Sequence, residues 1–246
     1  MAIPSQPRRF LEVVYRSEAY WAHPLLAALN AAPGLASLHQ QWPMSRLSDL
    51  AFAIETRLAL LTEMVRTVDR KLNILAERLA KEADLSPYVE GPYAFDFNED
   101  EAIRAVLINA TGFISEARSC FENLADFQRD FLRHYFAEVI PEKDRYEEVA
   151  KLTTDRAWAD ELPKHRHDIR HDRAPWLALV VTPGPPTRYD PVLVLNWRPG
   201  HFGPDDCIAF SALRAIRDGL REALNRVRDK LIARVEQAGH GVGRAD

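Results

Sequence analysis

Three long stretches of the chain lack proline and contain almost no glycine, and they constrain the fold more than any other feature. The first, residues 45–83, places leucine, isoleucine and valine at steps of three and four between Leu47 and Leu79. Side chains at this spacing lie on one face of an α-helix. Residues 103–131 repeat the pattern with several phenylalanines, and residues 213–235 show it again. We therefore expect three long helices that pack on each other through their apolar faces.

Between the second and the third of these stretches the apolar pattern changes. Residues 177–181 and 192–196 are rich in valine and leucine, and they flank a turn that contains glycine and prolines. Two such runs around a turn predict a β-hairpin. We expect an all-α fold, an antiparallel helical bundle that forms a single domain over residues 1–246, with a small β-hairpin insertion at about 176–197.

The charge and the cysteines exclude several classes of protein. The formal net charge of -4 gives no overall basic field that would draw the chain to nucleic acid or to anionic lipid, so any affinity for phosphate must come from a local patch. The two cysteines, Cys120 and Cys207, are far apart, which argues against a disulfide framework or a cysteine zinc site. No apolar run is long enough to span a bilayer. We expect a cytoplasmic protein with no membrane association.

Residues 162–176, LPKHRHDIRHDRAPW, contain three histidines, three arginines and two aspartates. Pro163 suits the first position of a helix, and Pro175 disfavours helical geometry at Ala174, so we expect a short helix between them. On this helix Arg166, Arg170 and Arg173 follow one side, and His167 and His171 follow another. So much charge on a short helix cannot all point into a core.

Three interpretations of this stretch remain open from the residues themselves. His167 and His171, with Asp168, have the spacing of zinc ligands on one helix face, although the arginines beside them repel a cation. Alternatively, arginine forks match phosphate oxygens and an imidazole moves protons near neutral pH, which suits a phosphate-bearing substrate. The third interpretation is a solvated helix whose charges pair locally.

The segment RHDIRH, from Arg166 to His171, resembles the R-x4-6-H signature of the HEPN superfamily (higher eukaryotes and prokaryotes nucleotide-binding). The resemblance covers the bundle loosely, from about residue 47 to 238, and the motif closely over a few residues. It implies a helical bundle that is usually a homodimer and, in many members, a metal-independent endoribonuclease of toxin or antiviral defence systems. Arg129 and His134, in RDFLRH, form a rival match.

The resemblance also implies roles for individual residues and partners. His171 would be the general acid/base, Arg166 the cation that stabilises the transition state, and His167 the polar orienting residue. Arg170 and Arg173 would contact RNA phosphates. We expect an RNA substrate, no cofactor, a homodimer and an antitoxin or defence-system partner. The alternatives are a catalytically silent HEPN-like bundle that binds a nucleotide or a partner protein, and a His/Asp metal hydrolase.

Overall fold

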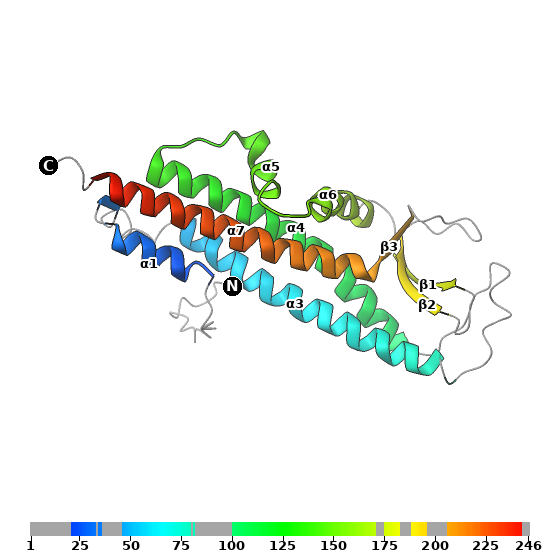
Figure 1. Cartoon of the computed structure of the whole chain (residues 1–246). Coiled ribbons are helices and arrows are strands. Elements are labelled where there is room, and N and C mark those ends of the chain that lie inside the picture. Colours follow the sequence, from blue (N-terminus) through cyan, green and yellow to red (C-terminus); the bar gives the residue numbers. More distant parts are fainter. Residues whose placement is uncertain are drawn as a thin grey trace, which may run out of the picture.

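The computed structural model describes residues 21–32, 34–35, 46–79, 81, 100–170, 175–182, 188–195 and 206–242. Three long helices lie side by side and form the body of the molecule: α3 (Arg46–Leu79), α4 (Asp100–Phe136) and α7 (Phe210–Val242) (Figure 1). A small sheet lies at one end of these helices. The predicted all-α bundle with a small β insertion is confirmed.

The three long helices do not all alternate in direction: one neighbouring pair is antiparallel and another is parallel. Lys71 near the end of α3 pairs with Glu101 at the start of α4, and Arg46 at the start of α3 pairs with Asp126 far along α4, so these two helices are antiparallel. Helices α4 and α7 instead run in the same direction (Figure 1). The reason is that the segment between them, which includes the sheet, returns the chain to the end of the bundle at which α4 begins.

Helix α4 is the central element, because α3, α5, α6 and α7 all contact it. Four of its phenylalanine side chains are fully buried: Phe113, Phe121, Phe127 and Phe131. Full burial of a phenylalanine contributes roughly 1.5–3 kcal/mol relative to exposure, so these rings stabilise the bundle considerably. The apolar stripe predicted for α7, from Leu213 to Val235, is buried at each predicted position.

Two groups of short helices cover the outside of this core. Helix α1 (His23–Ala31), which the sequence pattern did not reveal, packs on α7. Just before it, the Trp21 indole N–H donates to the Ala51 carbonyl at 3.1 Å, and its ring meets Phe127 edge-on. After α4, the 3-10 helix η3 (Glu142–Asp144), α5 (Arg145–Ala150) and α6 (Ala157–Arg170) follow along one side of the bundle (Figure 1).

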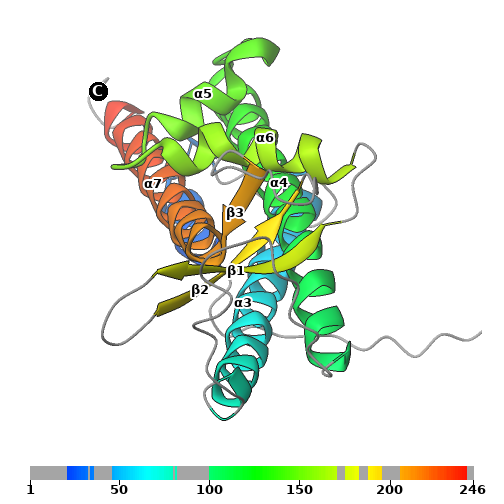
Figure 2. The ribbon, with the colours of Figure 1, turned by 90° about the vertical axis from the view of Figure 1, so that its right-hand side faces the viewer.

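The sheet has three antiparallel strands in the order β1 (Trp176–Thr182), β2 (Arg188–Val194) and β3 (Cys207–Ala209) (Figure 2). The hairpin β1–β2 is the predicted one, although β2 begins earlier and ends earlier than the run 192–196. Strand β3 lies before the predicted last helix and was not expected from the sequence. It pairs Ile208 with Leu193, and both side chains are buried. Strand β3 continues directly into α7, and its residues belong to the same apolar run as the start of that helix. The sequence pattern therefore does not separate the strand from the helix.

A glycine on α7 sets the approach of α6. A Cβ atom at Gly219 would lie 2.3 Å from Cδ1 of the Trp158 indole, which packs edge-on against Phe121. Gly219→Ala should therefore lower the free energy of unfolding by about 1–3 kcal/mol, in spite of the better helix propensity of alanine. Urea denaturation followed by circular dichroism measures the change.

Gly112 on α4 provides the matched control. A Cβ there would meet only the flexible end of Met64, at 3.3 Å, so Gly112→Ala should be neutral or stabilising. If the two variants had the same free energy of unfolding, the close contact between Trp158 and Gly219 of α7 would be contradicted.

Candidate functional site

Helix α6, which carries the first part of the histidine- and arginine-rich stretch, begins at Ala157, so the predicted start at Pro163 is wrong. Asp155 accepts a hydrogen bond from the backbone N–H of Ala157 at 2.9 Å and starts the helix. Trp158 and Leu162 are then buried against the bundle. Their packing outweighs the backbone hydrogen bond that Pro163, exposed inside the helix, cannot donate.

Arg166 lies half-buried on the side of α6 that faces α4. Its Nη1 is 3.2 Å from Oε1 of Glu122, and Nε of Arg118 is 2.9 Å from the same oxygen. Two guanidinium groups from two helices therefore share one carboxylate. Because a guanidinium has several N–H donors, the bond to Glu122 leaves Arg166 able to hold a second anion.

Two histidines flank Arg166 in the sequence and point in different directions. His167 is exposed, whereas the side chain of His165 is largely covered, with Nε2 3.9 Å from Oε2 of Glu161. Arg166 and the exposed His167 thus put a phosphate-binding group and a proton-transferring group at neighbouring positions of α6.

The remaining predicted site residues fall at or beyond the end of α6. Arg170 is the last residue of α6, but its side chain lies outside the described part of the chain, as do His171 and Arg173. The structure thus places Arg166 and His167, and it leaves the expected pairing of Arg166 with His171 as a prediction. Among the described residues, no group of three or more histidine, cysteine, aspartate or glutamate side chains is arranged to hold a metal ion. The metal interpretation depends on His171 and Asp168, whose side chains are not among them.

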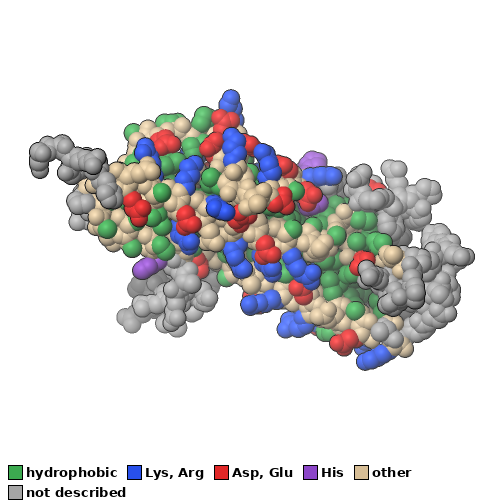
Figure 3. Space-filling view, viewed as in Figure 1, with side chains coloured by type: hydrophobic (Ala, Val, Ile, Leu, Met, Phe, Trp, Pro, Cys, Tyr) green, Lys and Arg blue, Asp and Glu red, His purple; other side chains and the backbone are tan. Residues whose placement is uncertain are grey.

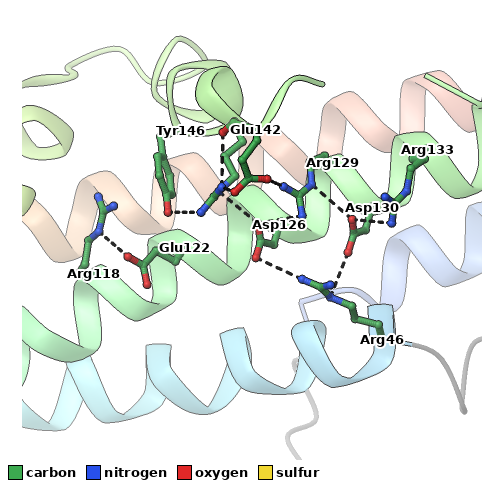
Figure 4. A network of polar contacts seen from close by, with 10 residues as sticks. Arg46, Arg118, Glu122, Asp126, Arg129, Asp130, Arg133, Glu142 and Tyr146 are labelled. Carbon is green, nitrogen blue, oxygen red and sulfur yellow. Dashed lines mark hydrogen bonds and ion pairs between the residues drawn. The ribbon is translucent and has the colours of Figure 1, made fainter. Parts of the chain in front are cut away.

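Arg129, the arginine of the rival motif, lies in a different environment (Figure 4). Arg129 belongs to a network of ion pairs that connects α3, α4, η3 and α5. We call it the four-arginine network; its members are Arg46, Arg129, Arg133, Arg145, Asp126, Asp130 and Glu142. Arg129 contacts all three of these carboxylates, and His134 is an exposed side chain that packs edge-on against Tyr135. These contacts give Arg129 a structural role.

Sequence reasoning missed Glu122 and Arg118. An arginine and a glutamate four residues apart on α4 indicate no more than a local helix pair. The link to Arg166 joins residues 44 positions apart, and no local pattern reveals it.

The cysteines offer no activated nucleophile. Burial is the main cause that raises the pKa of Cys120 to about 12. Burial, together with the nearby Asp206 carboxylate, also raises the pKa of Cys207. A thiol attacks as its thiolate, so neither residue suits covalent catalysis at neutral pH.

Acidic and basic side chains are interspersed on the face of the molecule shown in Figure 3, in agreement with a net charge of -4. Among the described helices, none combines the length and the apolar character that crossing a bilayer requires. Comparisons with models of protein families, with curated proteins and with solved structures found no match.

The four-arginine network generates a stability prediction. Asp130 is 5% exposed and lies 3.2 Å from both Arg46 Nε and Arg133 Nη2. Asp130→Asn keeps the shape but removes the charge that holds these guanidinium groups together, so we expect a loss of about 2–4 kcal/mol in the free energy of unfolding. Chemical denaturation at low salt measures it.

The exposed pair of Arg228 and Asp229 on α7 provides the control, because Asp229→Asn should change stability by less than about 0.5 kcal/mol. Equal effects of the two substitutions would show that the network contributes no more than an ordinary surface ion pair.

Proposed function

We propose that this chain is a metal-independent endoribonuclease of the HEPN type, active as a homodimer in the cytoplasm. The observation that carries the proposal is the position of Arg166, whose guanidinium is held at the surface of α6 by Glu122; His165 and His167 flank this arginine in the sequence. The RHDIRH motif supplies His171 five residues further along the chain.

The proposed chemistry needs no cofactor. An imidazole removes the proton from a 2′-hydroxyl of the RNA, and the resulting oxygen attacks the adjacent phosphorus. The bond from phosphorus to the 5′-oxygen breaks, and the imidazolium gives its proton to that oxygen. His171 is the acid/base group, and Arg166 stabilises the negative charge that builds up on the phosphate. His167 orients the reacting groups, and Arg170 and Arg173 contact flanking phosphates.

Two chains are needed to complete the site. If the helical path continued from Arg170 to His171, residues five apart would diverge by about 140°, and Arg166 and His171 of one chain would point away from each other. If α6 of a second chain faces the first, each Arg166 meets the His171 of its partner. RNA cleavage at such a shared site would suit a toxin or a defence protein that an antitoxin or another partner restrains.

The first test is cleavage in the absence of metal. Purified protein in excess EDTA should cut RNA and leave a 2′,3′-cyclic phosphate, because the attacking group belongs to the substrate. Mass spectrometry of the products identifies this end group. Activity that disappears with EDTA and returns with zinc would assign His167, Asp168 and His171 to a metal hydrolase. Intact RNA under all conditions would favour a silent bundle that binds a nucleotide or a protein.

The second test removes the proposed groups one at a time. Arg166→Ala and His171→Ala should each lower the cleavage rate at least about a hundredfold. Arg166→Ala should lower the melting temperature by no more than about 4 °C, because its ion pair with Glu122 is partly exposed.

Two other arginines serve as controls for this test. Arg66→Ala removes a similar pair, with Glu63 on α3, and should leave the rate unchanged. Arg129→Ala, measured below its melting temperature, should also keep the rate. Wild-type rates in both the Arg166 and the His171 variants would rule out this site.

A further inference from the structure

Two arginines from different helices meet at one carboxylate oxygen beside the proposed RNA site. Oε1 of Glu122 accepts hydrogen bonds from Arg118 at 2.9 Å and from Arg166 at 3.2 Å. Two guanidinium groups and one carboxylate leave an excess of positive charge at this point.

We propose that Arg118 and Arg166 form a clamp for one phosphate of the RNA, and that the Glu122 carboxylate occupies the position of that phosphate until RNA binds. This inference rests on the proposed function and adds Arg118 as a phosphate-binding residue of the same site. Glu122 then competes with the RNA phosphate for the two guanidinium groups. Its carboxylate holds both arginines in place before RNA binds and weakens the affinity for RNA.

The surroundings of Arg118 fix its guanidinium before any ligand arrives. Its Cζ lies 4.5 Å from the centroid of the Tyr146 ring, and its side chain is 13% exposed. An arginine stacked on an aromatic face keeps the donors at its edge free for hydrogen bonds in its own plane. Arg118 therefore loses little conformational entropy when it binds an anion.

The open side of the clamp is at Glu122 and Arg166, which are 31% and 27% exposed. A phosphate can approach there, and the displaced carboxylate can turn into water without burial of its charge. A phosphodiester carries one negative charge, as the carboxylate does, so the exchange keeps the charge balance around the two guanidinium groups. It also supplies several acceptor oxygens for their donors.

A purely structural ion pair would behave differently from this clamp. If Glu122 only ties α6 to α4, neutralising it weakens the structure and cannot improve RNA binding. If Glu122 competes with phosphate, neutralising it leaves two unopposed guanidinium groups, and RNA binding becomes tighter. The sign of the effect on RNA affinity separates the two roles.

The experiment measures binding rather than cleavage. The probe is a short fluorescein-labelled oligouridylate with 2′-O-methyl groups, which blocks attack by the 2′-hydroxyl, and anisotropy is followed in excess EDTA over a range of salt. We expect Glu122→Gln to lower the Kd at least about threefold at low salt, because no carboxylate then competes with the phosphate for the two guanidinium groups. Arg118→Gln should raise the Kd about tenfold.

The pair Glu63 and Arg66 on α3 gives matched controls, since Glu63→Gln and Arg66→Gln should each change the Kd less than about twofold. Arg118→Lys keeps the positive charge but lacks the forked donors of a guanidinium. It replaces Arg118→Gln in the test if that variant proves less stable than wild type. It too should bind more weakly than wild type.

An unchanged or higher Kd for Glu122→Gln, or wild-type affinity in both Arg118 variants, would overturn the clamp. Displacement of the probe by equimolar ATP would assign the arginines to a free nucleotide and would overturn the RNA assignment. If the variants shift affinity as expected while unmodified RNA stays intact, the clamp stands and the proposed ribonuclease fails. If RNA is cut in EDTA but substitutions of Arg118 and Glu122 do not change RNA binding, the proposed ribonuclease stands and the clamp fails.

Discussion

The burial of α4 is the constraint on which the rest of the structure depends. A helix with fully buried phenylalanines along most of its length must be covered on several sides, and no single neighbouring helix can do this. Helices α3 and α7 cover two sides, and α5 and α6 cover another. The short polar helices α5 and α6 are therefore needed to cover the core, and the position of α6 is set by its packing on α4.

This arrangement explains why Arg166 meets Glu122. Trp158 fits over Gly219 of α7 and against Phe121 of α4, which fixes the first half of α6. The second half then passes the carboxylate of Glu122, one residue after Phe121 on α4. The aromatic packing thus positions the charged site, whereas the four-arginine network holds η3 and α5 against α4 further along the same helix (Figure 4).

The elements whose apolar residues recur at regular steps could be predicted from the sequence. Those that depend on contacts between distant residues could not. Repeated apolar steps indicated α3, α4 and α7, and two apolar runs around a turn indicated β1 and β2. Strand β3 is too short to show a period, and the early start of α6 depends on the buried Trp158 and Leu162. At the site, Arg166 and His167 were recognisable as chemistry-bearing residues. Glu122 and Arg118 were not, because their link to Arg166 exists only in the folded chain.

The proposed metal-free cleavage of RNA requires a site that two chains share. The most direct measurement mixes two inactive variants, Arg166→Ala and His171→Ala, under conditions in which subunits exchange. In a mixed dimer with shared sites, one site keeps both native residues and the other has neither. At equal concentrations, the account predicts recovery of about a quarter of the wild-type activity in EDTA. If each chain used its own Arg166 and His171, the mixture would stay inactive, and that result would contradict the shared site.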